Sequence, residues 1–399
     1  MTWLCSADSH FDEPSDLWIK RLPSSLQGRA PHLEWTDAGR ETWVEGQLDS
    51  VLTRGVFADE PRHIPDRIDL MEQQGIWSEV LIGNVGAGTV LGMRDAELAT
   101  NCARAYNDYL AEVYGPYGDR QIAVGLVPIL DLSFALKEIE RVASLGLHGV
   151  TMPIMTAEHA PYFHEVYEEL WAAAAAQHLP ILFHINTGGR GGPENAIAAA
   201  AVSQDQRTQA AMRSIGVMTG ANQAFNVLAS LVGSGVLERY PELHIVFVEC
   251  EAAWLASAIE ALDYGWGVQE IKRPGLERFG DDVMTVLMDG ETGEEVRLST
   301  MQRMGGGWPY SLRPSDYVRR QVHATFIDEP AAVKFREFIG TQQLMWGSDF
   351  PHGEGTFPDT KEILDQLFDG VSASDRDAMT GGAAAQLYGI KLPVGSATD

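Results

Sequence analysis

The feature that most constrains the fold of this chain is a series of eight short apolar runs, separated by segments with helical spacing. The runs are Trp3–Ala7, Glu79–Gly83, Ile122–Val127, Gly149–Met152, Ile181–Phe183, Ile245–Val248, Val322–Phe326 and Leu344–Gly347. Nearly continuous apolar runs that alternate with helices are typical of parallel strands buried on both faces of a sheet. An open doubly wound sheet usually has about five or six strands and a glycine-rich phosphate turn, and no G-x-G-x-x-G follows the first run. The pattern therefore predicts an α/β fold, a closed (β/α)8 TIM barrel.

The segments between the runs predict the helices and two inserts. The helices are expected at Asp66–Gly75, Asp95–Tyr114, Ser133–Leu145, His164–Gln177, Asn222–Arg239, Ala252–Tyr264, Ala331–Ile339 and Thr360–Phe368. Residues 31–55 and 268–314 do not fit the repeat, and each contains a hairpin pattern. We expect residues 1–399 to form a single barrel domain, with these two inserted hairpins capping one face.

Composition excludes several classes of partner. The chain has 56 acidic and 29 basic residues and a formal net charge of −27, so we expect neither nucleic-acid binding nor membrane binding. The three cysteines share no metal-type spacing and do not make a disulfide framework. The first residues, MTWLCSADSH, lack a secretory pattern, and no stretch of about eighteen residues stays apolar. These observations predict a cytoplasmic protein.

Potential metal ligands stand at the ends of four of the eight runs. They are Asp8 and His10 after the first run, His184 after the fifth, Glu249 after the sixth, and Asp349 with His352 after the eighth. A single acid at a strand end is commonly a cap, and a single histidine is commonly a hydrogen-bonded core residue. In a barrel, however, the carboxyl ends of all strands meet at one rim. Unpaired charges buried there would be costly, and a divalent cation would compensate them.

Six segments carry a resemblance to a known family. They read SADSHFDEPSDLW, DRIDLMEQQGIWSEVLI, CARAYNDYLAEVYG, LPILFHINTGG, GVLERYPELHIVFVECEAAWLASAIEALDY and MWGSDFPHGEGTFP. The chain resembles the amidohydrolase superfamily over nearly its whole length, specifically the branch related to aminocarboxymuconate-semialdehyde decarboxylase. These segments are more specific for the fold and the metal site than for the reaction.

The resemblance implies a mononuclear metal site. By position the ligands are Asp8, His10, His184 and Asp349, with Asp8 in place of the commoner first histidine. Two carboxylates with two imidazoles suit Zn²⁺, which we expect first, and tolerate Mn²⁺. Glu13 is either a further oxygen ligand or a first-turn charge near a helix start.

Three further residues are candidates for chemistry. The family's decarboxylases commonly carry a histidine where this chain has Glu249, which is either a general base or a backbone-bonding residue. His352 either assists the metal ligands as a proton donor or satisfies a loop carbonyl. Arg190, in TGGRGG, either binds a substrate carboxylate through its planar fork or is a solvated loop residue.

These residues predict an enzyme. The first reading is a metal-dependent hydrolase that cleaves a C–N or C–C bond in a small aromatic or ring-derived compound, with Asp349 and Glu249 moving protons and His352 assisting. The alternative is a non-oxidative, metal-dependent decarboxylase of an aromatic or unsaturated acid, and a third reading is a non-catalytic metal-binding barrel. We also expect a small-molecule substrate and a homodimer. The insert at 268–314 is either a lid over the barrel or the dimer interface.

Overall fold

The computed structural model describes residues 3–37, 39–52, 63–84, 86–156, 159–189, 205–266, 284–288, 295–299 and 308–393. Its parallel strands follow the predicted runs closely. They are β1 (Leu4–Phe11), β5 (Ile76–Gly83), β6 (Gln121–Ala123), β7 (Gly125–Leu126), β8 (Val150–Pro153), β9 (Ile181–His184), β10 (Ile245–Val248), β13 (Val322–Phe326) and β14 (Leu344–Trp346).

Two hydrogen-bonded sheets, with strand orders β1-β5-β6 and β14-β13-β10-β9-β8-β7, together make one barrel. At one junction β6 and β7 form a single strand that changes partner at Val124, whose N–H donates to the carbonyl of Leu81, while the next N–H donates to the carbonyl of Gly149. At the other junction the N–H of Asp349, just after β14, donates to the carbonyl of Asp8 on β1. The predicted (β/α)8 barrel is therefore confirmed.

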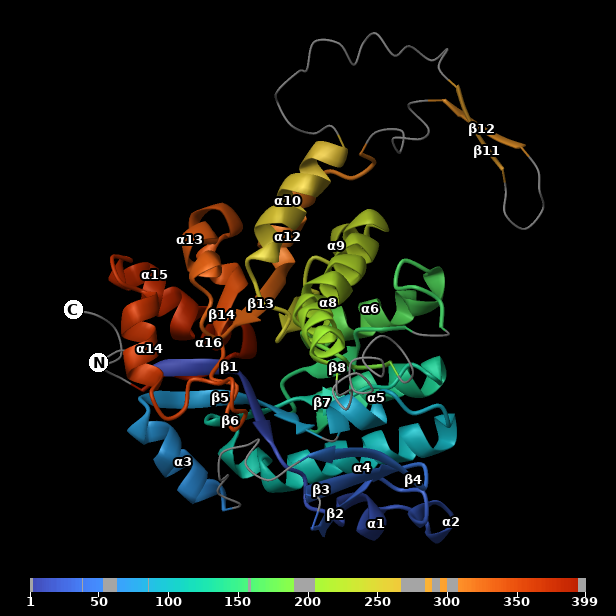
Figure 1. The fold of residues 1–399 in the computed structure, drawn as a ribbon. Coiled ribbons are helices and arrows are strands. Elements are labelled where there is room, and N and C mark those ends of the chain that lie inside the picture. Colours follow the sequence, from blue (N-terminus) through green and yellow to red (C-terminus); the bar gives the residue numbers. More distant parts are fainter. Residues whose placement is uncertain are drawn as a thin grey trace.

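Helices surround the strands (Figure 1). They are α1 (Leu17–Arg21), α2 (Ser24–Gln27), α3 (Ile64–Gln73), α4 (Ala96–Val113), α5 (Leu132–Ser144), α6 (Glu168–Ala176), α8 (Gln206–Gly233), α9 (Val236–Arg239), α10 (Trp254–Gly265), α12 (Pro314–Gln321), α13 (Pro330–Ile339), α14 (Thr360–Leu367), α15 (Ala373–Asp377) and α16 (Ala383–Tyr388). Aspartates begin several of them: the carboxylate of Asp95 accepts from the third residue of α4, and that of Asp131 accepts from the second and third residues of α5. These caps fix where the helices start and so where the preceding loops end.

The helix predicted at Asn222–Arg239 differs from the structure at both ends. Helix α8 starts at Gln206, and Gly235, with φ 73°, separates it from α9. By length and composition α8 would suffice to cross a membrane, which is weak evidence by itself. Its second half packs into the hydrophobic core, where Leu228 and Leu231 are buried. A helix that packs against other parts of the same protein passes the same length and composition test, and this burial fits that explanation.

The two inserts contain antiparallel pairs. Within 31–55 the structure has three strands, β2 (His32–Thr36), β3 (Gly39–Val44) and β4 (Gln47–Leu52), one more than the predicted hairpin. Within 268–314 the predicted hairpin is present as β11 (Met284–Met288) and β12 (Glu295–Ser299). Most of that insert lies outside the described residues, so its role as lid or interface stays a prediction.

Candidate metal centre

Strand β1 delivers the first two candidate ligands to the carboxyl rim of the barrel. Asp8 and His10 are two residues apart, so their side chains leave the strand on the same side. Both residues are buried, at 0% and 2% exposure. The loop after β14 is bonded to the same strand, because the N–H of His10 donates to the carbonyl of Phe350. This pairing brings Asp349 beside them although it lies more than three hundred residues away in sequence.

Four ligand atoms converge around His10. Its Nε2 lies 3.4 Å from Oδ1 of Asp8, 3.3 Å from Oδ1 of Asp349 and 3.4 Å from Nε2 of His184. Ligand atoms about 2.0–2.2 Å from a tetrahedral metal ion stand about 3.3–3.6 Å from one another. Each of the three distances from Nε2 of His10 matches the spacing of two ligands of one ion.

The protonation of His184 suits a metal ligand. Its Nδ1 lies 3.0 Å from the carbonyl oxygen of Ile185, which accepts only, so Nδ1 carries the proton. In the neutral ring the lone pair is then on Nε2, the atom that faces His10. A histidine whose other ring nitrogen is held by a carbonyl in this way is oriented for coordination.

Buried polar atoms of the cluster lack well-aligned hydrogen bonds. They are Oδ1 of Asp8, both carboxylate oxygens of Asp349 and Nδ1 of His10. Burying ionised carboxylates without compensation is costly, and a divalent cation supplies that compensation. The residues present therefore fit the metal ion that the resemblance implied.

The local charges shift the pKa values of the cluster. Burial would lower the pKa of His10, but its contacts with Asp349 and Asp8 raise that pKa well above its usual value. Burial would raise the pKa of Asp349, but its contacts with His10 and His352 hold it at about 2. Without a metal ion, protonated imidazoles balance the carboxylates, so metal binding must release protons.

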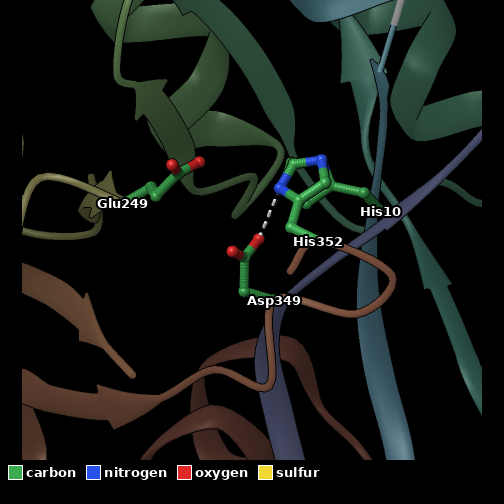
Figure 2. Close-up of side chains that lie close together, drawn as sticks. All are labelled: His10, Glu249, Asp349 and His352. Atoms are coloured by element: carbon green, nitrogen blue, oxygen red, sulfur yellow. Dashed lines mark ion pairs between the residues drawn. The ribbon is translucent and has the colours of Figure 1, made fainter. Parts of the chain in front are cut away.

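Glu249 and His352 both reach this cluster (Figure 2). Oε2 of Glu249 lies 3.2 Å from Nε2 of His184. Nδ1 of His352 lies 2.9 Å from Oδ1 of Asp349, and its ring stacks on His10 at a centroid distance of 4.2 Å. His352 thus contacts a candidate ligand, and its role stays a prediction.

The other two candidates are placed differently. Glu13 is buried, and its Oε1 accepts a hydrogen bond of 2.6 Å from the N–H of Gly86. The side-chain groups within metal-binding reach, as far as the structure describes the chain, do not include Glu13. Its carboxylate holds the loop after β5 instead. Arg190 lies outside the described residues.

Sequence reasoning missed two residues that contact the cluster. Thr325 on β13 donates from its hydroxyl to Oδ2 of Asp8 at 3.4 Å. Asn84, after β5, contacts Nε2 of His352 through its Oδ1 at 2.9 Å. Both are polar residues at the carboxyl ends of apolar runs, and that position was the signal that could have found them.

Comparisons with known proteins identify a family model and curated relatives that match the chain. The family model described as amidohydrolase matches residues 83–390. The gamma-resorcylate decarboxylase of Polaromonas sp. (strain JS666) is 27% identical over 191 residues, which cover 45% of this chain and 53% of that protein. The enzyme of the same name from Rhizobium radiobacter is 29% identical over 124 residues, which cover 30% of this chain and 37% of that protein. The match thus spans about half, or less, of the length of these curated relatives.

Solved structures share the fold along almost the full chain. An amidohydrolase from Mycobacterium avium subsp. paratuberculosis has a TM-score of 0.72 at 18% identity, covering 97% of this chain and 99% of that one. The 5-carboxyvanillate decarboxylase of Sphingomonas paucimobilis has a TM-score of 0.65 at 19% identity, covering 98% and 100%. A dihydroxybenzoic acid decarboxylase from Polaromonas sp. JS666, solved with manganese and 2-nitroresorcinol, has a TM-score of 0.62 at 17% identity, covering 98% of each chain.

Proposed function

The chain belongs to the amidohydrolase family, and we propose that it is a metal-dependent enzyme that removes CO₂ from a hydroxylated aromatic or unsaturated acid. The observation that carries this proposal is the buried cluster of Asp8, His10, His184 and Asp349, with His352 against the last of them. The names of the curated relatives support decarboxylation over hydrolysis, which reverses the order expected from the sequence.

The residues of the cluster would divide two tasks. Asp8, His10, His184 and Asp349 would hold one divalent ion, which supplies positive charge for an anionic substrate and for the charge that develops as CO₂ leaves. We place Mn²⁺ ahead of Zn²⁺, because a structural relative was solved with manganese.

The pair formed by Asp349 and His352 is suited to hold a proton at the barrel mouth. Their closest atoms are 2.9 Å apart, and the side chain of His352 is 14% exposed while that of Asp349 is fully buried. When the bond between the ring carbon and the carboxylate breaks, its electron pair stays on that carbon. Asp349 and His352 together would deliver the proton that the carbon then takes up, and no water would be consumed.

The test uses purified enzyme loaded with Mn²⁺ or Zn²⁺ and a panel that includes 2,6-dihydroxybenzoate and 5-carboxyvanillate. We expect CO₂ release with one proton gained by the product, and no ¹⁸O in the product when the reaction runs in labelled water. His184→Ala is the control for metal dependence. Incorporation of solvent oxygen would instead establish the hydrolase reading, in which Glu249 serves as general base.

Assembly and location complete the proposal. We propose a homodimer in the cytoplasm acting on a small molecule, in keeping with the acidic composition and the family. Light scattering at micromolar concentration tests the dimer, and a monomeric mass would contradict it.

A further inference from the structure

Glu249 stands where the resemblance leads one to expect a histidine, and its carboxylate lies against the metal-facing atom of His184. Its Oε2 is 3.2 Å from Nε2 of His184, the ring nitrogen that does not contact the carbonyl of Ile185. This distance resembles the 3.3–3.4 Å spacings among the other converging ligand atoms.

The backbone of Glu249 is held in an uncommon conformation. Its φ is +56°, in the left-handed region that residues other than glycine rarely adopt, and Asp349 at the end of β14 has φ +55°. Both acids follow strands at the carboxyl rim of the barrel. Such backbone persists where surrounding structure holds it and is concentrated at functional sites. The same device therefore turns both carboxylates towards one point.

A hydroxyl group couples Glu249 to the candidate ligand Asp8. The N–H of Glu249 donates to Oγ1 of Thr325 at 2.9 Å, so the single proton of that hydroxyl is free to point to Oδ2 of Asp8, 3.4 Å away. Oδ1 of Asp8 is then the oxygen that faces Nε2 of His10. Thr325 thus fixes the loop of Glu249 and the orientation of Asp8 together.

We propose that Glu249 is a fifth protein ligand of the same ion, so that three carboxylates and two imidazoles hold it. Ligand atoms of His10, Glu249, Asp349 and His352 all lie within 4.8 Å of one another, and so do those of Asp8, His10 and His184. A shared cation would compensate the buried carboxylate oxygens of Asp8 and Asp349 that accept no well-aligned hydrogen bond. The proposal rests on the metal dependence of the proposed function and is independent of the reaction.

A third carboxylate changes which metal the site prefers and how substrate reaches it. Carboxylate oxygens suit Mn²⁺, and imidazoles suit Zn²⁺. A third carboxylate therefore moves the preference of the site towards Mn²⁺. Five protein ligands would leave a six-coordinate ion one position for a substrate oxygen. Glu249 therefore acts by setting the ion's ligand set and leaves proton transfer to other groups.

The test measures metal binding in the absence of substrate. Glu249→Gln removes the charge and keeps the shape of the side chain. Glu251→Gln is the matched control, because Glu251 is an exposed acid on the same loop and also has a positive φ. Free Mn²⁺ is followed by electron paramagnetic resonance, and the visible absorption of the Co²⁺-loaded protein reports the coordination number.

Glu249→Gln is expected to weaken Mn²⁺ binding at least about 10- to 100-fold, to weaken Zn²⁺ binding less, and to intensify the Co²⁺ absorption as a ligand is lost. Glu251→Gln is expected to match the wild type. Wild-type Mn²⁺ affinity and an unchanged Co²⁺ spectrum in Glu249→Gln would overturn the assignment. If that variant does not fold, Glu249→Asp, which shortens the side chain, takes its place with the same expectations.

The outcome is separable from that of the proposed function. Loss of Mn²⁺ affinity without CO₂ release from any tested acid would leave the ligand assignment standing and sink the decarboxylase. If the wild type releases CO₂ and Glu249→Gln leaves the Mn²⁺ affinity unchanged, the decarboxylase proposal stands and the ligand assignment is wrong.

Discussion

The two ends of the barrel hold histidine pairs in opposite chemical settings. At the carboxyl end His10 and His184 face each other among carboxylates, and their pKa values are raised. Towards the amino end Nδ1 of His244 lies 3.0 Å from Nε2 of His323, whose Nδ1 donates to the carbonyl of Gln342. Burial without a carboxylate partner lowers the pKa of His323 to about 4. The same residue type is prepared for a cation at one end and kept neutral at the other.

Buried carboxylates show the same contrast. Glu79 on β5 receives two hydrogen bonds from the guanidinium of Arg67, at 2.6 and 3.0 Å, and a third from Gln121. Its charge is balanced inside the protein. Asp8 and Asp349 are as deeply buried, yet Oδ1 of Asp8 and both carboxylate oxygens of Asp349 lack well-aligned hydrogen bonds. A carboxylate in the middle of β5 is thus balanced by the protein itself, whereas these oxygens at the carboxyl rim, the end that carries function in such barrels, are not.

The largest expected effect is the loss of activity when a histidine at the carboxyl end of the barrel is replaced. His184→Ala should remove the bound metal and lower activity by about 10³-fold or more, since the ion supplies several kcal/mol of charge stabilisation. The unfolding midpoint of the metal-free protein should change little. Elemental analysis and urea titration measure these two quantities. His63→Ala, at an exposed histidine, is the control; retained metal in His184→Ala would break the comparison.

The next effect concerns stability. Glu79→Gln removes the carboxylate that pairs with the buried guanidinium of Arg67, at a cost of about 3–5 kcal/mol in the free energy of unfolding. Metal content per folded molecule should remain that of the wild type. Urea unfolding checks the first value. Glu112→Gln breaks the exposed ion pair with Arg21 and should cost less than about 1 kcal/mol; equal losses would show that burial is not the cause.

A smaller effect depends on pH. His323 is neutral in the folded protein down to a pKa of about 4, whereas the unfolded chain takes up a proton near its usual value of 6.5. Stability from this residue is therefore complete above about pH 6.5 and falls by up to about 3 kcal/mol as the pH drops towards 4. His323→Gln should flatten the dependence of the unfolding free energy on pH relative to wild type. His63→Gln, measured alongside, should not.

The smallest effect lies at Thr325. Thr325→Val keeps the shape of the side chain but removes the hydroxyl that joins the N–H of Glu249 to Asp8. Metal affinity should fall about 10-fold, and Thr325→Ser should restore most of it. Calorimetric titration with Mn²⁺ measures both variants. If Thr325→Val and Thr325→Ser have the same Mn²⁺ affinity, the hydroxyl has no part in orienting the ligands.

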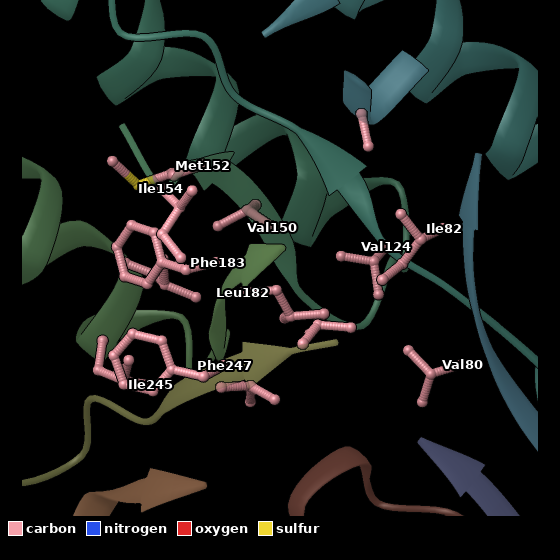
Figure 3. Packing of buried hydrophobic residues seen from close by; sticks show 14 of the residues in the cluster. Val80, Ile82, Val124, Val150, Met152, Ile154, Leu182, Phe183, Ile245 and Phe247 are labelled. Atoms are coloured by element: carbon pink, nitrogen blue, oxygen red, sulfur yellow. The ribbon is translucent and has the colours of Figure 1, made fainter. Parts of the chain in front are cut away.

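The barrel itself could be predicted because the pattern that specifies it is local. Runs such as Ile181–Phe183 and Ile245–Val248 are apolar at every position, and the structure buries all of these side chains (Figure 3). Strands covered on both faces require this. The start of α8 was missed because residues 206–221 do not keep their apolar side chains on one buried face: Ile215 and Met218 are 48% and 61% exposed.

The sequence alone determined the metal-site residues Asp8, His10, His184 and Asp349 as candidates, since parallel strands carry whatever follows them to one rim. Tertiary structure decided how the remaining groups meet. It turned Glu13 to the N–H of Gly86, brought Thr325 to Asp8, and aimed Glu249 at His184 through a left-handed backbone. Strand direction and side-chain period follow from neighbouring residues. Which donor meets which acceptor depends on loops that are distant in sequence and on backbone angles that residue type alone does not specify.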